Sequence, residues 1–75
     1  MTIQDRIRAL REEGKKHITQ SELGEALHKS QKAISRLETG EVHLIADDII
    51  AYCKLFNVSA DYILGLPKDM NYPER

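Results

Sequence analysis

The most informative polar residues of the chain lie in the segment QKAISR, which begins at residue 31. If this segment is helical, Ala33 and Ile34 fall on one face and the polar side chains point the other way. The polar face carries Gln31, Lys32, Ser35 and Arg36. A Gln side chain can bond to adenine through two atoms, and Lys or Arg can bond to guanine. Since no carboxylate follows in this helix before Glu38, the face fits the electronegative major groove of double-stranded DNA.

Other reactive residue types do not combine into a site. His17, His28, His43 and Cys53 are too scattered for metal-ligand spacing, and a single cysteine forms no internal disulfide. Asp47 and Asp48 are adjacent, so in a helix they face different directions and fit the positive end of the helix dipole better than a catalytic pair. The chain has no nucleophile–base pair and no phosphate-binding loop. We therefore expect no enzyme activity, no metal or other cofactor, and no small-molecule substrate.

Length and composition fit one small globular domain. The chain has 75 residues, of which 41% are apolar and 31% charged. No apolar run approaches the roughly 20 residues that span a bilayer. The N-terminus carries Asp5, Arg6 and Arg8 where a signal peptide needs apolar residues. We expect a cytoplasmic protein with no membrane contact, and the lone Cys53 fits a reducing compartment.

Charge is distributed unevenly along the chain. The net charge is −1, but residues 1–36 hold eight Lys or Arg against five acids, whereas residues 37–75 hold three against seven. This asymmetry indicates a basic face on an acidic remainder. A basic face fits a nucleic-acid partner, although charged stretches are more often plain solvated surface.

Helix signals divide the chain into five short helices, at about residues 3–13, 20–27, 31–39, 45–56 and 60–64. The residues expected to cap their N-termini include Thr2, Thr19, Ser30 and Ser59, and those expected to end them are Gly14, Gly40, Asn57 and Gly65. No segment alternates as a strand would, so the predicted fold class is all-α.

The second and third helices are close enough in sequence to form a helix-turn-helix motif. Their predicted contact residues are Leu23, Leu27, Ile34 and Leu37, with Gly24 and Ala33 where the backbones approach most closely. The fourth helix carries one apolar stripe, made of Ile45, Ile49, Tyr52, Cys53 and Phe56. Cys53 is therefore expected to be a buried small apolar residue.

At these positions the sequence resembles the lambda-repressor-like helix-turn-helix family, also called the Cro/C1 or XRE type. The first half of the family pattern is matched by Thr19-Gln20, Leu23, Ser30, Ile34-Ser35, Glu38 and Gly40, and the second half by Phe56-Asn57-Val58-Ser59, Asp61 and Ile63-Leu64-Gly65. The resemblance extends from Ile3 to Leu66. It implies a compact five-helix DNA-binding domain in residues 1–66, with the motif at 19–40, and a short C-terminal tail at 67–75.

The resemblance also implies individual roles. Base edges would be read by Gln31, Lys32 and Arg36, with Ser35 at the groove edge, and backbone phosphates would be bound by Gln20, Lys29 and Ser30. Arg11 and Glu38 occupy positions that pair as a semi-buried salt bridge between the first and third helices.

The chain departs from the family pattern in the turn of the motif. His28 stands where the family usually has Gly, Lys29 where it has an apolar Val, and Gly24 where it has Ala. A left-handed conformation is less favourable for His than for Gly, and Lys29 must either extend its stem along the surface or pack differently.

The expected function is sequence-specific binding of double-stranded DNA by a transcriptional regulator, a repressor that acts by occupying its operator. A palindromic operator requires a homodimer, weak without DNA, and the residues expected at its contact are Tyr62, Ile63, Leu66, Met70 and Tyr72. For Tyr62, Leu66 and Tyr72, an ordinary core position is an equal alternative. The second functional class is a DNA-binding antitoxin or other interaction module, whose acidic C-terminal half holds a partner protein.

Overall fold

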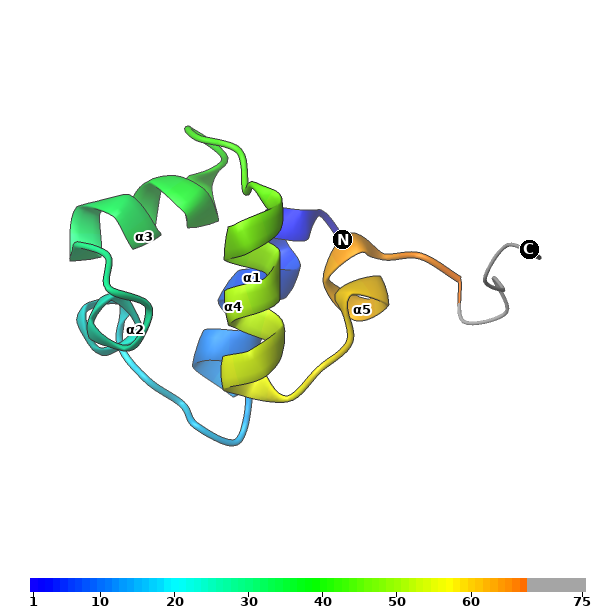
Figure 1. Cartoon of the computed structure of the whole chain (residues 1–75), viewed down its shortest axis with the longest axis horizontal. Coiled ribbons are helices and arrows are strands. Elements are labelled where there is room, and N and C mark those ends of the chain that lie inside the picture. Colours follow the sequence, from blue (N-terminus) through cyan, green and yellow to red (C-terminus); the bar gives the residue numbers. More distant parts are fainter. Residues whose placement is uncertain (68–75) are drawn as a thin grey trace.

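The computed structural model of the chain describes residues 1–67, and within them it has five helices and no strand (Figure 1). The helices are α1 (Ile3–Glu13), α2 (Gln20–Leu27), α3 (Gln31–Thr39), α4 (Ala46–Phe56) and α5 (Ala60–Leu64). This confirms the predicted all-α class with five short helices.

Side-chain caps fix where the helices begin. In both α1 and α2 a threonine hydroxyl accepts the N–H of the residue three positions on, and that residue's carboxylate accepts the threonine N–H. These backbone and hydroxyl donors lower the pKa of Asp5 and of Glu22. The α3 N-terminus is capped by the Ser30 hydroxyl, which accepts the N–H of Ala33 at 3.0 Å. Four helices therefore start where a hydroxyl side chain accepts one of their free N–H groups, whereas α4 follows Ile45, which makes no side-chain cap.

One apolar core holds the helices together. Its buried members are Ile7, Leu10, Leu23, Ile34, Leu37, Tyr52 and Ile63, so every helix contributes at least one. Partly buried side chains pack around them, among them Leu27, Ile49, Cys53 and Phe56. The ring of Phe56 stacks on that of Tyr52 with 6.0 Å between centroids. Such a shared core fixes the angles between short helices that have little stability alone.

Two predicted core assignments need correction. Ile45 was expected on the buried stripe of the fourth helix, but it is the residue before α4 and is 61% exposed. Because Ile45 precedes the first turn, its side chain does not share the face of Ile49 and Tyr52. Cys53 is only half-buried at the edge of the core.

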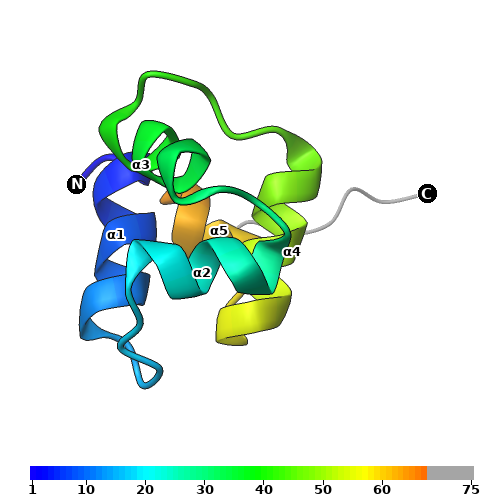
Figure 2. The ribbon, with the colours of Figure 1, turned by 90° about the vertical axis from the view of Figure 1, so that its left-hand side faces the viewer.

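The arrangement leaves one helix pair on the outside of the molecule. In Figure 1, α2 and α3 lie together on the side away from α5, and α1 and α4 stand between them. Figure 2 looks at that side directly and shows α2 across the front with α3 above it. The fold thus presents the α2–α3 pair to a partner and keeps the other three helices as its support.

Candidate nucleic-acid interface

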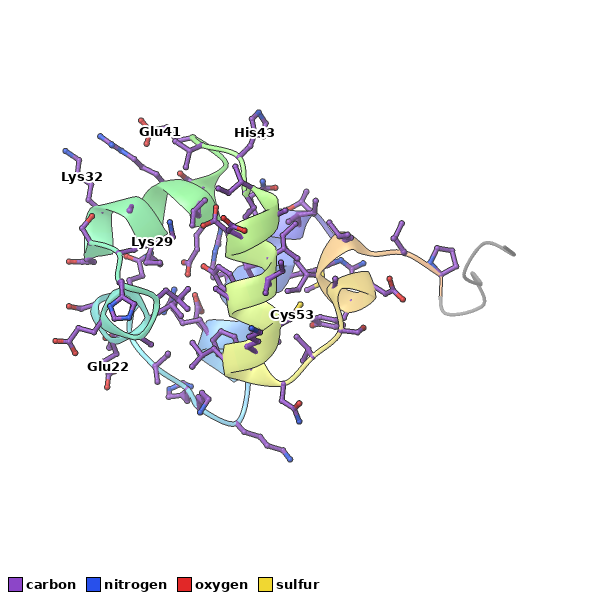
Figure 3. All side chains as sticks on the ribbon, viewed as in Figure 1. Glu22, Lys29, Lys32, Glu41, His43 and Cys53 are labelled. Carbon is purple, nitrogen blue, oxygen red and sulfur yellow. The ribbon has the colours of Figure 1, made fainter. Side chains whose placement is uncertain are left out.

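The outer face of α3 carries the polar residues that the sequence singled out. Gln31, Lys32 and Arg36 are exposed and Ser35 is partly buried, whereas Ile34 and Leu37 on the opposite face are 0% and 3% exposed. In Figure 3, Lys32 projects from the start of α3 away from the body of the molecule. The two faces of this helix are therefore sharply different, and only the polar face can meet a ligand.

The turn between α2 and α3 is tight, and its backbone explains two departures from the family pattern. His28 is left-handed, with φ of 58°, and the N–H of Lys29 donates to the carbonyl of Gly24 at 2.7 Å. A Cβ atom on Gly24 would lie 2.5 Å from the backbone oxygen of Lys29. Glycine at position 24 thus lets the turn pack directly against α2, while His28 bears the left-handed conformation.

Lys29 is directed toward the protein. Its ammonium lies 3.0 Å from Oδ1 of Asp48, and Oδ2 of the same carboxylate accepts the N–H of Ile45 at 3.1 Å. Figure 3 shows Lys29 between the turn and α4. Asp48 is only 7% exposed, so this ion pair ties the motif to the first turn of α4. The predicted phosphate contact of Lys29 therefore has a competing partner inside the protein.

Arg11 and Glu38 form a nearly enclosed ion pair between α1 and α3. The Nε and Nη2 atoms of Arg11 donate to Oε2 and Oε1 of Glu38 at 2.6 and 2.9 Å, and Glu38 is 2% exposed. These bonds raise the pKa of Arg11. Gln20 also belongs to this group, because its Nε2 donates to Oε1 of Glu38 at 3.1 Å. The side-chain amide at the start of α2 is thus held by the same carboxylate that anchors α1.

Tyr52 lies beside this network without joining it. Burial, with the nearby carboxylates of Glu38 and Asp48, raises the pKa of its phenol. Its hydroxyl is buried and has no hydrogen-bond partner among the residues that the structure describes. The phenol therefore stays neutral under ordinary conditions and contributes through packing.

Three contacts were not anticipated from the sequence: Lys29–Asp48, Gln20–Glu38 and the ion pair between Arg36 and Glu41 at 3.5 Å. Gln20–Glu38 joins two helices, whereas Lys29 and Glu41 lie in the connections before and after α3. Periodicity identifies the faces of one helix, and it gives no register between helices. A usable signal was present only at Lys29, where a cation replaces an apolar residue and calls for an anionic neighbour.

Of the residues expected at a dimer contact, the structure describes three, and these do not all lie at the surface. Tyr62 and Leu66 are 42% and 43% exposed, but Ile63 is 0% exposed and belongs to the core. Including Ile63 was wrong, because it lies on the face of α5 that packs on the other helices. Met70 and Tyr72 lie outside the described residues. Two further apolar side chains are exposed, Leu64 on α5 at 37% and Ile50 on α4 at 50%.

No three His, Cys, Asp or Glu side chains within residues 1–67 gather as metal ligands would. In the same part of the chain, no helix has the length and apolar character needed to cross a membrane.

The fold and the exposed α2–α3 pair define a class of DNA-binding domain. The family model described as Helix-turn-helix matches residues 7–63, and the chain belongs to this family, of the lambda-repressor-like (Cro/C1, XRE) type. It is accordingly a DNA-binding transcriptional regulator. Neither the curated proteins nor the solved structures contain a significant match to the chain.

Proposed function

We propose that the chain is a repressor that binds one DNA sequence and blocks polymerase by occupying it. The observation that carries this proposal is the outer face of α3, where Gln31, Lys32 and Arg36 are exposed opposite the buried Ile34 and Leu37. Amide and guanidinium groups on a protruding helix match the hydrogen-bonding edges of bases in the major groove. Ser35 lies closer to the body of the domain and would meet the groove edge.

Phosphate contacts in this proposal come from the two helix N-termini. Gln20 and Ser30 precede free N–H groups that point out of α2 and α3, and such termini favour an anion. Lys29 can reach a phosphate only by leaving Asp48, to which it is bound at 3.0 Å. We therefore assign Lys29 to the ion pair with Asp48 and not to a phosphate contact.

In this proposal the DNA-binding unit comprises residues 1–66, and residues 67–75 form a tail. The protein is proposed to be cytoplasmic. One recognition helix reads only a few base pairs, which is too little to specify a unique genomic site. Two copies on a palindrome, with their recognition helices about 34 Å apart, would double the sequence that is read. The exposed Tyr62 and Leu66 support a weak homodimer through α5. In the antitoxin alternative the same apolar side chains would hold a partner protein.

Selection from a pool of duplexes with a randomised centre tests the repressor proposal. The wild-type chain should enrich a palindromic motif, and a promoter carrying that motif should be silenced when the chain is expressed. Enrichment of no motif would contradict sequence-specific binding. A motif without silencing would contradict only the repressor role.

A further inference from the structure

The loop after α3 folds back over the end of that helix. Gly40 is left-handed with φ of 82°, and the N–H of Val42 then donates to the carbonyl of Arg36 at 3.3 Å. The hydroxyl of Thr39 donates to the same carbonyl, also at 3.3 Å. Glu41 sits between these anchored residues, and Figure 3 shows it projecting from the same upper edge of the molecule as Lys32. The backbone therefore holds the Glu41 carboxylate next to the reading face.

This carboxylate contacts Arg36 in a particular way. Oε2 of Glu41 is 3.5 Å from Nε of Arg36, and the two side chains are 64% and 43% exposed. The terminal nitrogens of Arg36 have no hydrogen bond or ion pair within residues 1–67. A guanidinium is planar, so an anion at Nε favours some orientations of that plane and leaves the terminal nitrogens free. That free end can bond to O6 and N7 of a guanine.

We propose that Glu41 is a positioning residue for base reading, which aims Arg36 at a guanine. The proposal rests on the proposed role of Arg36. An unpaired arginine at this exposure samples many rotamers, and the entropy lost when DNA selects one of them lowers the affinity. An existing ion pair removes part of that loss. The Glu41 charge also repels phosphates, which penalises every sequence, and only a correctly placed guanine compensates for it.

The experiment compares Glu41→Gln with the wild-type chain on two probes. One is the duplex that the wild-type chain enriches from a randomised pool, and the other is a scrambled duplex of the same composition. We expect affinity for the scrambled duplex to rise about twofold because a negative charge is lost. We expect affinity for the enriched duplex to fall about two- to fivefold, the scale of an exposed ion pair. The ratio of the two affinities should therefore fall about four- to tenfold.

Two control variants separate orientation from charge alone. Asp47→Asn removes an equal exposed charge at the start of α4, where it has no ion-pair partner in the described part of the chain. It should raise both affinities equally and leave the ratio unchanged. In an Arg36→Ala background, Glu41→Gln should no longer alter the ratio, because the orienting effect acts through Arg36.

The outcomes decide between the explanations. A ratio unchanged by Glu41→Gln, or raised by it, would overturn the positioning role and mean that Glu41 merely repels DNA or sequesters Arg36. If Arg36→Ala alone leaves the ratio unchanged, the base-reading role of Arg36 fails, and the positioning role with it. If Arg36→Ala lowers the ratio and Glu41→Gln does not, only the role of Glu41 fails.

Discussion

Glu38 is a buried carboxylate whose polar contacts come from two other helices. It is 2% exposed, and its carboxylate accepts two hydrogen bonds from Arg11 and one from Gln20. A carboxylate removed from water to this extent is tolerated only when donors replace the water. The same residue therefore links α1 to α3 and fixes the side chain at the start of α2.

Breaking the Arg11–Glu38 ion pair should lower the free energy of unfolding more than breaking the exposed Arg11–Glu12 pair. Glu38→Gln leaves the Arg11 guanidinium without its buried anion, so we expect a loss of about 2–4 kcal/mol in the free energy of unfolding measured with urea. Combining it with Arg11→Met should lose less than the sum of the two single changes. Glu12 also pairs with Arg11, at 3.3 Å but with 49% of its side chain exposed. Glu12→Gln is therefore the matched control, with an expected change under about 0.5 kcal/mol. Equal losses for Glu38→Gln and Glu12→Gln would contradict this account.

The partner of the Lys29 ammonium can be tested through the salt dependence of DNA affinity. If its ammonium stays on Asp48, Lys29→Met should lower the free energy of unfolding but leave the slope of log affinity against log salt unchanged. A phosphate contact would instead reduce that slope by about one. Lys54→Met, which removes an exposed cation from α4 outside the α2–α3 pair, is the control and should leave the slope unchanged. A reduced slope for Lys29→Met would restore the phosphate role predicted from the family pattern.

At the scale of the helices, local signals were sufficient for the boundaries and insufficient for the contacts between elements. Thr2, Thr19 and Ser30 were predicted as caps because hydroxyl capping involves only residues three apart. Ile63 was assigned to the wrong face because α5 has only five residues, too few for periodicity to define a face. The Lys29–Asp48 pair depends on how the turn meets α4, so the cation at position 29 predicts an anionic neighbour without identifying which one.

Gly24 gives a prediction at the scale of the helices, because glycine is favoured over alanine at this position although alanine is usually the better helix residue. Alanine is about 1 kcal/mol better than glycine inside a helix, yet a Cβ at position 24 meets the Lys29 oxygen at 2.5 Å. We expect Gly24→Ala to lower the free energy of unfolding by about 1–3 kcal/mol. Ala26→Gly, at an exposed position of the same helix, should follow the ordinary preference and lose about 1 kcal/mol. A more stable Gly24→Ala chain would show that the turn relaxes freely.

For the whole molecule, the proposed two-fold assembly on DNA requires a surface outside the α2–α3 pair. Tyr62 and Leu66 are exposed near the end of the described chain, and the Arg6 guanidinium lies 5.7 Å from the centre of the Tyr62 ring. That contact holds Tyr62 in place and leaves Leu66 as the simpler position to alter.

Leu66→Asp should weaken self-association without unfolding the domain, because a carboxylate would be buried in an apolar contact between copies. Sedimentation of the free protein over a concentration series should show a weaker dimer, with an unchanged helical circular dichroism spectrum. Val42→Asp, at 41% exposure in the loop after α3, is the control and should sediment as the wild type does. A wild-type chain that stays monomeric at every concentration and binds a palindrome one to one would contradict the homodimer.

The central claim is that the outer face of α3 reads bases, and the ratio of affinities for the enriched and scrambled duplexes measures it directly. For Gln31→Ala, Lys32→Ala and Arg36→Ala, we expect losses of about 1–3 kcal/mol on the enriched duplex and much smaller losses on the scrambled one. Equal losses on the two duplexes would contradict the claim, since side chains that touch only phosphates weaken binding to every sequence alike.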